Sequence, residues 1–256
     1  MLRALRQTAR FRIGYNNGVM SEANGSANPP RQFVNYAFYK VDPAWRRLPA
    51  DERARGKEEF ARVVEDYRGR AIVIPFSTVG TRPDTDLLLW RVSYELETLQ
   101  EMSARLMATG LGQWLQTPYS FLGQAKTSVY EDPYIHPSQE EKRGRVRPGE
   151  FKYLFVYPFV KTRAWFLLPK EERQAIMKDH IRVGHEYPSI KLNTIYSFGL
   201  DDQEWVVAFE SNRPSDFVDL VMELRETKSS LFTLRDTPIF TCVRGELRPV
   251  LDLLGG

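Results

Sequence analysis

The sequence is poor in cysteine, in long apolar runs and in net charge, and each shortage excludes a class of protein. The single cysteine, Cys242, leaves no disulfide within the chain and indicates a reducing compartment, so we expect a cytoplasmic protein. No apolar run approaches the ~18 to 20 residues that a membrane-spanning helix needs. With 36 basic and 33 acidic residues the net charge is only +3, so nucleic-acid binding would require a local basic patch. The sequence has no evenly basic face to supply one.

The first 31 residues differ in composition from the rest of the chain. The stretch MLRALRQTARFR holds four arginines and no acidic residue. This composition resembles an organelle presequence, although a disordered basic arm is the simpler interpretation. The following SEANGSANPP is rich in Ser, Asn, Gly and Pro, which indicates a flexible linker. We therefore expect a flexible basic arm over residues 1–31.

The remainder alternates strand and helix patterns, and it does so twice. The first series runs from the strand-like FVNYAFYKV to YSFLGQAKTSVY, and the second from FKYLFVYPFV to IFTCVRGEL. Each series reads strand, helix, strand, strand, helix, strand. The sequence thus predicts an α+β fold of two tandem ferredoxin-like βαββαβ repeats with antiparallel sheets, of the dimeric α+β barrel type. We assign residues 32–128 to an N-terminal domain, 129–150 to a linker loop and 151–256 to a C-terminal domain.

Two of the three histidines, His180 and His185, lie in a segment that predicts a helix over residues 169–186. His180 interrupts an apolar stripe of that helix, and Gly184 follows it one turn later, which fits an imidazole presented to haem iron. A lone histidine on an apolar face is also typical of a hydrogen-bonded core residue, so both interpretations stay open here. A spacing of five is poor for sharing one metal, which disfavours a two-histidine site. The members of the stripe are Ile176, His180, Val183 and Tyr187.

Several motifs around this helix fall into one register. They are VGTRPDTDLLLW in the first half, then FVYPFVKTRAWFLLPKEERQAIMKDHIRVGHEYP, then GLDDQEWVVAFE. Together they resemble the chlorite dismutase superfamily, and most closely its coprohaem decarboxylase branch of the actinobacterial type. The resemblance covers nearly the whole chain from about residue 31 and includes the duplicated fold. It implies that the C-terminal domain binds haem and that the linker loop lies over the site.

The resemblance also implies roles for individual residues. His180 matches the proximal iron ligand, and Tyr157 in VYPFVK matches the tyrosine that becomes a radical near a propionate. Lys161 occupies a basic position that can meet a propionate, and Trp165 in AWFLLP matches a tryptophan beside the proximal pocket. These residue types suit the chemistry, because a tetracarboxylate needs cationic partners and an oxidisable side chain must stand beside the reacting propionate.

Further positions follow from the same resemblance. His136 in YIHPSQ looks like the distal histidine of the actinobacterial type, which would act as the base toward bound peroxide. Arg143, or Arg145 beside it, and Ser230 after the last helix are candidates for propionate contacts. Cys242 lies in the strand IFTCV, where a buried inert thiol is more typical than a thiolate ligand.

One position decides between the two activities of the family. Chlorite decomposition requires a distal arginine on the strand that follows the haem helix, and an ungapped alignment of IKLNTIYSFGLDD places Leu192 there. A slip of one residue would give Lys191 or Asn193 instead. No register gives arginine, so we expect efficient chlorite chemistry to be absent.

The predicted activity is therefore that of a haem-dependent oxidoreductase. It is the hydrogen-peroxide-dependent oxidative decarboxylation of coprohaem III to haem b, in which the iron porphyrin is substrate, product and cofactor at once. Two alternatives stay open: a haem-binding carrier or sensor without turnover, and a cofactor-free assembly module. The resemblance further implies a homopentamer. The predicted partners are coprohaem and hydrogen peroxide, with no nucleic acid and no membrane span.

Overall fold

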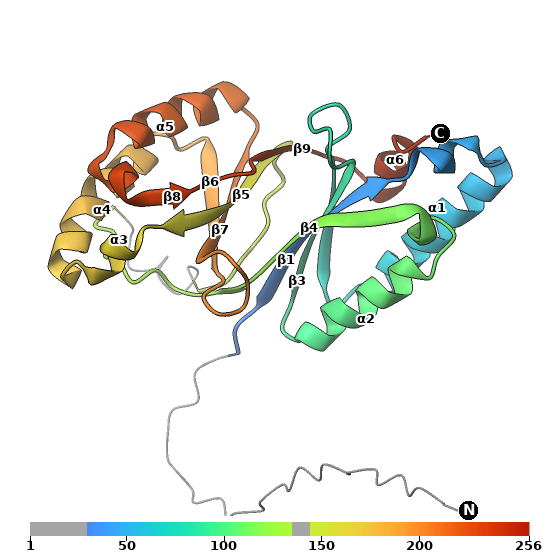
Figure 1. Ribbon diagram of the computed structural model, residues 1–256, viewed down its shortest axis with the longest axis horizontal. Coiled ribbons are helices and arrows are strands. Elements are labelled where there is room, and N and C mark those ends of the chain that lie inside the picture. The colour runs from blue at the N-terminus through green and yellow to red at the C-terminus, as the bar shows by residue number, and fades with distance from the viewer. Residues whose placement is uncertain (1–29, 135–143, 256) are drawn as a thin grey trace, which may run out of the picture.

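A nine-stranded antiparallel sheet runs through the molecule, and its strands come from both halves of the chain (Figure 1). The computed structural model describes residues 30–134 and 144–255. The first half contributes, in order, β1 (Phe33–Val41), the short helix η1 (Pro43–Arg47), α1 (Ala50–Asp66), β2 (Ile72–Ser77), β3 (Leu87–Ser93), α2 (Leu96–Met107), η2 (Gly112–Trp114) and β4 (Leu115–Ala125).

The second half repeats this order with additions at its end. It contributes β5 (Tyr153–Lys161), α3 (Arg163–Leu167), α4 (Lys170–His185), β6 (Ile190–Tyr196), β7 (Trp205–Ser211), α5 (Pro214–Glu226), η4 (Lys228–Phe232), β8 (Thr233–Arg235), β9 (Phe240–Arg244) and α6 (Leu247–Asp252). The predicted tandem βαββαβ arrangement is thus confirmed. The sequence patterns missed the short β8 and the terminal α6, and β4 begins earlier than the pattern YSFLGQAKTSVY suggested.

The sheet closes on itself. The strand order is β7-β6-β4-β1-β3-β2-β9-β5-β8, and β7 also pairs with β5, so eight strands form a ring with β8 on its outside. Within residues 30–134 and 144–255, only two short ladders join the halves, and each has two residue pairs. These pairs are Phe76↔Arg244 and Ser77↔Val243 between β2 and β9, and Gln124↔Tyr196 and Ala125↔Ile195 between β4 and β6.

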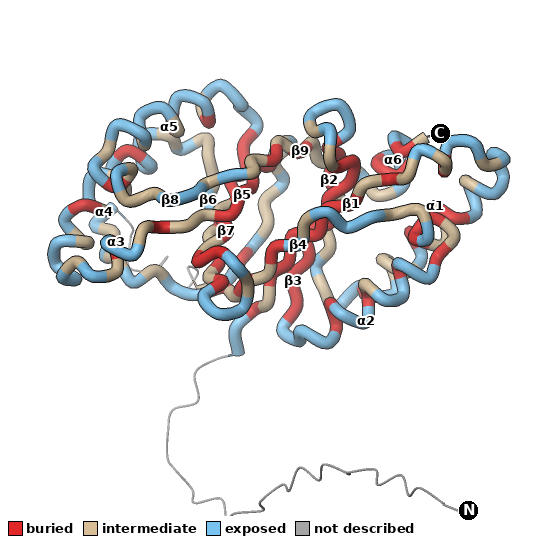
Figure 2. Tube along the Cα trace, in the orientation of Figure 1, coloured by how far each residue is buried: buried red, intermediate tan, exposed pale blue. Residues whose placement is uncertain are grey.

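Three apolar clusters hold the elements together. The inner faces of the two half-sheets meet in the middle of the molecule, where the strands are buried while the outer helix surfaces are exposed (Figure 2). A second cluster lies between the N-terminal half-sheet and α1, α2 and α6, and a third between the C-terminal half-sheet and α4 and α5. Cys242 lies in the central cluster with no exposed surface, and burial raises the pKa of its thiol. This placement agrees with an inert core thiol.

The two halves repeat at an offset of 120 residues. β1 and β5, and likewise η1 and α3, have bounds this far apart, and Pro49 and Pro169 are the N-cap residues of α1 and α4. Between residues 44–67 and 164–187 nine side chains are identical without a gap. In the first copy they are Ala44, Trp45, Leu48, Pro49, Glu52, Arg53, Arg62, Val63 and Tyr67.

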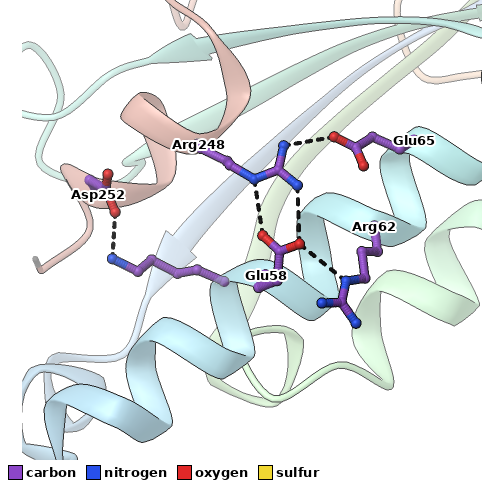
Figure 3. A network of polar contacts seen from close by, with 6 residues as sticks. Glu58, Arg62, Glu65, Arg248 and Asp252 are labelled. Carbon is purple, nitrogen blue, oxygen red and sulfur yellow. Dashed lines mark hydrogen bonds and ion pairs between the residues drawn. The ribbon is translucent and has the colours of Figure 1, made fainter.

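The last helix returns to the first half of the molecule. α6 packs on α1 and buries Val250 and Leu251, and three charged contacts lie over this junction (Figure 3). Arg248 Nε lies 2.9 Å from Glu58 Oε2 and its Nη1 lies 2.7 Å from Glu65 Oε1, while Lys57 Nζ lies 2.5 Å from Asp252 Oδ1. Exposed ion pairs of this kind contribute little, so the buried apolar residues supply most of the docking energy.

Among the helices of the described residues, none combines the length and the hydropathy required to cross a lipid bilayer.

Candidate haem site

A cavity of about 310 Å³ lies on the outer face of the C-terminal half-sheet, between α5, η4, β8 and the middle of β5. This volume is at the lower end of the ~300 to 1,000 Å³ typical of ligand pockets. One wall is apolar and consists of α5 residues Phe217, Val218, Val221, Met222 and Leu224. The polar lining residues are Tyr157, His180, Arg225, Ser229, Ser230, Thr233 and Asp236.

His180 opens onto this cavity from α4. The predicted stripe has the expected orientation, because Ile176 and Val183 are buried and Tyr187 packs against the third apolar cluster. A Cβ added at Gly184 would meet no atom within 4 Å, so the packing of the chain itself does not require glycine there. The sequence therefore placed His180 correctly on the inward face of the helix.

The His180 imidazole is held in its neutral form. Burial, and then the positive charge of Lys161, lower its pKa to about 4. Its Nδ1 atom is buried and has no hydrogen-bond partner. A core histidine normally has its ring nitrogens hydrogen-bonded, so this ring does not fit the interpretation of a satisfied core residue. A neutral imidazole facing a cavity can instead act as a metal ligand.

His185 points elsewhere. Its Nε2 atom lies 3.1 Å from both carboxylate oxygens of Asp132, and the centroid of its ring lies 5.0 Å from that of the Tyr134 ring, with the two rings tilted at 45°. These residues belong to the start of the linker, so His185 fastens the linker to the outer side of α4. The two histidines of α4 thus have separate roles.

Tyr157 reaches the cavity from β5. Its side chain is buried, stacks on Phe209 and lines the cavity together with His180. Burial is the main reason that its pKa is raised; the negative charge of Asp236 raises the pKa further and the positive charge of Arg225 lowers it. The phenol therefore stays protonated at neutral pH, and its oxidation must release a proton together with an electron.

Lys161 lies one layer behind the cavity wall. Its Nζ donates to the Ser229 backbone carbonyl at 2.6 Å and to Ser229 Oγ at 2.9 Å, and it stands 4.7 Å from the centroid of the Trp165 ring. Burial lowers its pKa to about 8, which leaves it mostly charged at neutral pH. Trp165 is 1% exposed and packs between Lys161 and Phe232, so it supports the lysine and does not line the cavity.

Ser230 lines the cavity, as its assignment to a propionate contact requires. Its hydroxyl lies within hydrogen-bond distance of the backbone carbonyls of Arg225 and Thr227, at 2.7 and 2.9 Å. It therefore donates to the end of α5 in this structure. The neighbouring Ser229, which the sequence did not single out, is the residue that holds Lys161.

The strand register settles the orientation of Leu192. It pairs with Phe209, and Tyr157 pairs with Val207 two residues earlier on β7, so Leu192 and Tyr157 share one face of the sheet. Asn193 faces the opposite side, where its amide donates to Glu210 at 2.9 Å. Leu192 is 53% exposed on the face that carries the cavity. Of the three candidates, Leu192 therefore lies on the face that carries the cavity, whereas Lys191 and Asn193 lie on the opposite face.

Two predicted site residues, His136 and Arg143, lie outside the described residues. The linker on either side of them is fixed to the C-terminal half. Glu131 exchanges hydrogen bonds with the Gln174 side chain, and Gly149 donates its backbone N–H to the buried carboxylate of Glu210. Both ends of the linker are thereby anchored to this half of the molecule.

The sequence analysis missed two charged residues of the cavity. Arg225 at the end of α5 and Asp236 after β8 line it from two elements that are separate in sequence, and no motif connects them. One signal was available. α5 carries apolar residues over more than one face, and Val218 and Met222 are 56% and 62% exposed beside the cavity.

Comparison with known proteins agrees with this geometry. The sequence model of the family described as chlorite dismutase matches residues 53–245. The coproheme decarboxylase of Mycolicibacterium smegmatis is 28% identical over 217 residues, which cover 81% of this chain and 89% of that protein.

Solved structures give the same relationship. A mutant chlorite dismutase from Candidatus Nitrospira defluvii superposes with a TM-score of 0.81 at 25% identity, covering 89% of this chain and 96% of that one. A heme-binding protein from Thermus thermophilus superposes with a TM-score of 0.77 at 27% identity, covering 88% and 95%. The predicted resemblance is confirmed: this chain belongs to the chlorite dismutase family.

Proposed function

We propose that the protein is a haem-dependent oxidoreductase that converts coprohaem III to haem b by hydrogen-peroxide-dependent oxidative decarboxylation. The observation that supports this most is the neutral, largely buried imidazole of His180, which opens onto an apolar cavity beside the buried phenol of Tyr157. The relative named coproheme decarboxylase supports the choice of substrate.

Three features of the site fit an iron porphyrin with carboxylate groups. An unprotonated imidazole can bind iron, and the apolar wall of α5 suits the flat macrocycle. Among the described residues, the buried ammonium of Lys161 donates to the backbone carbonyl and the hydroxyl of Ser229 and to no carboxylate, so a propionate that reached it would not displace another carboxylate. We assign His180 as the ligand, with Lys161 and Ser230 as candidate propionate contacts.

The reaction balances for each propionate side chain. One propionate side chain, one peroxide molecule and one proton give a vinyl group, carbon dioxide and two molecules of water, and two rounds yield haem b. Bound coprohaem supplies the iron at which peroxide is reduced. We assign to Tyr157 the removal of a hydrogen atom from the propionate, a step that its phenol can perform once the reduction of peroxide has taken an electron and a proton from it; its side chain stands at the cavity wall.

Two further residues enter the proposed reaction. We assign to His136 the movement of a proton between the oxygens of peroxide, in line with the imidazole's ordinary pKa of about 6.5. Leu192 presents no charge or hydrogen bond that could retain an anionic oxygen species, so we expect no efficient chlorite decomposition.

The test measures the absorption spectrum of the bound porphyrin and the mass of the product. Apoprotein is titrated with ferric coprohaem, then with peroxide, and the product is analysed for the loss of two carboxyl groups. We expect His180→Ala to change the absorption spectrum, and Tyr157→Phe to bind coprohaem with an unchanged spectrum but to lose at least about 100-fold in rate.

Tyr153→Phe is the matched control, because Tyr153 lies on the same face of β5 and does not line the cavity. Wild-type protein that leaves coprohaem unchanged at full occupancy would overturn the proposal. Tight haem uptake with no effect of Tyr157→Phe would favour a carrier or sensor.

A further inference from the structure

Met222 places a thioether on the wall of the cavity. It lies on α5 one turn after Val218, and of the described residues that line the cavity it alone carries a sulfur atom. Met222 is 62% exposed. Because the sulfur is near the end of the side chain, solvent and small solutes reach it while the cavity holds no ligand. A flat ligand bound against this apolar wall would cover it.

The other sulfur atoms of residues 30–134 and 144–255 are placed differently. Met102 and Cys242 have no exposed surface, and Met177 is partly buried. Met107, at the end of α2 in the N-terminal half, is 61% exposed and does not line the cavity. Met222 and Met107 therefore match in exposure and differ in their distance from the candidate site.

Hydrogen peroxide, the proposed co-substrate, oxidises accessible methionine directly. One peroxide molecule transfers one oxygen atom to the thioether sulfur, and the products are one methionine sulfoxide and one molecule of water. Sulfur is oxidised by two electrons and the O–O bond of peroxide is broken, so no further reactant is consumed. The sulfoxide is polar, and a polar oxygen that a macrocycle covers without a hydrogen-bond partner weakens binding.

We propose that Met222 is a site of reversible oxidation by peroxide, and that its sulfoxide lowers the affinity of the cavity for coprohaem. This inference rests on the proposed function and adds a regulation of the same site. A bound porphyrin shields the sulfur, whereas an empty cavity leaves it open to peroxide. Peroxide in excess over coprohaem therefore oxidises the empty protein and lowers further loading, and a methionine sulfoxide reductase restores the thioether.

The first measurement maps where peroxide reacts. Protein without porphyrin is treated with hydrogen peroxide, alone or with zinc coproporphyrin III, because zinc can bind an imidazole and has no redox chemistry. Mass spectrometry follows the gain of one oxygen at each methionine. Met222 and Met107 should react at rates within about threefold of each other in the empty protein, and zinc coproporphyrin should slow Met222 alone, by at least about fivefold.

The second measurement compares affinities without turnover. After peroxide is removed, ferric coprohaem is titrated into treated and untreated protein, with absorption as the readout. Treated wild-type protein should bind at least about fivefold more weakly. Met222→Leu should keep its affinity through the treatment, whereas Met107→Leu, the matched control, should lose affinity as wild type does. Met222→Gln, which is polar without oxidation, should bind coprohaem weakly even when untreated.

Three results would overturn the inference. They are an unchanged affinity once Met222 is oxidised, a loss of affinity that persists in Met222→Leu, and equal oxidation of Met222 with and without zinc coproporphyrin. Failure of the proposed function looks different, because wild-type protein would then bind coprohaem without decarboxylating it. The affinities before and after peroxide treatment would still decide the role of Met222.

Discussion

The two halves of this protein share a scaffold and differ where the chemistry is expected. Trp45 and Trp165 are each 1% exposed, and Arg53 and Arg173 each donate a backbone N–H at 3.1 Å to the proline that caps their helix. These repeated residues fix the turn from strand to helix in both halves. Their recurrence in a half that carries no histidine at the equivalent position argues that Trp165 is part of the scaffold.

The differences fall on three positions of the repeat. His180, Lys161 and Tyr157 correspond at the offset of 120 to Phe60, Val41 and Ala37, all of which lie in the second apolar cluster with at most 1% exposure. In the N-terminal half these positions fill a core. In the C-terminal half the same positions present an imidazole, an ammonium and a phenol, and a cavity lies beside them.

We expect the largest effect when His180 is replaced by phenylalanine, the residue at the equivalent position of the N-terminal half. His180→Phe places the residue of the first half at the position of the proposed iron ligand. We expect decarboxylation to fall roughly 100-fold or more, with a changed coprohaem spectrum, because the nitrogen that we propose to bind iron is lost. His185→Phe, on the outer side of the same helix, is the control and should retain the spectrum. If His180→Phe kept the wild-type spectrum, the imidazole would not be what distinguishes the C-terminal half from the N-terminal half.

The reciprocal change tests whether the N-terminal half can host the site. Phe60→His puts an imidazole into a fully buried position, so we expect the free energy of unfolding to fall by about 3 kcal/mol, measured by chemical denaturation. Coprohaem should still bind at one site per chain, because Val41 and Ala37 supply neither charge nor phenol. A second equivalent of bound coprohaem would show that the scaffold alone makes the site.

Positions 180 and 60 should also differ in their contribution to the pH dependence of the free energy of unfolding. The folded pKa of His180, about 4, lies below the unfolded value of about 6.5. Between these values the unfolded chain binds more protons, so His180 makes the apoprotein less stable as the pH falls from about 6.5 to 4, by up to about 3 kcal/mol. Denaturation of wild type and His180→Leu across this range gives the contribution as a difference. Parallel curves would contradict the buried, neutral imidazole.

The smallest effect concerns the repeated tryptophans. Trp45→Phe and Trp165→Phe should each lower the free energy of unfolding by about 1 to 2 kcal/mol, because each removes part of a fully buried side chain. If Trp165 serves the scaffold, its variant should also keep coprohaem affinity within about twofold of wild type. A selective loss of affinity in Trp165→Phe would instead support the role beside the proximal pocket that the family resemblance implied.

Local patterns predicted the elements well. The segment that predicted a helix over residues 169–186 became α4, and the two consecutive strands in the middle of each series formed in the predicted order. Closure of the ring was not visible in the sequence, because it depends on two ladders of two residue pairs between distant strands. The division into domains at residues 128 and 150, the homopentamer and the cytoplasmic location stay predictions.

Within the site, residues that belong to one motif could be named from the sequence, whereas residues that meet only in space could not. Tyr157, Lys161 and His180 lie within 24 consecutive residues and follow a family pattern. Arg225 and Asp236 belong to α5 and to the segment after β8, and their contact depends on how those elements pack. Ser229 was missed for the same reason, since its partner Lys161 is 68 residues away.

The sequence by itself determined the duplicated βαββαβ order, the inward face of α4 and the identity of the imidazole on it, because periodicity and capping act over a few neighbouring residues. The tertiary structure decided which of two equivalent positions becomes the candidate site. Burial without a hydrogen-bond partner lowers the pKa of His180, and the packing of α5 and β8 brings Arg225 to the same cavity. Desolvation and charge proximity depend on the whole fold, and no local pattern encodes them.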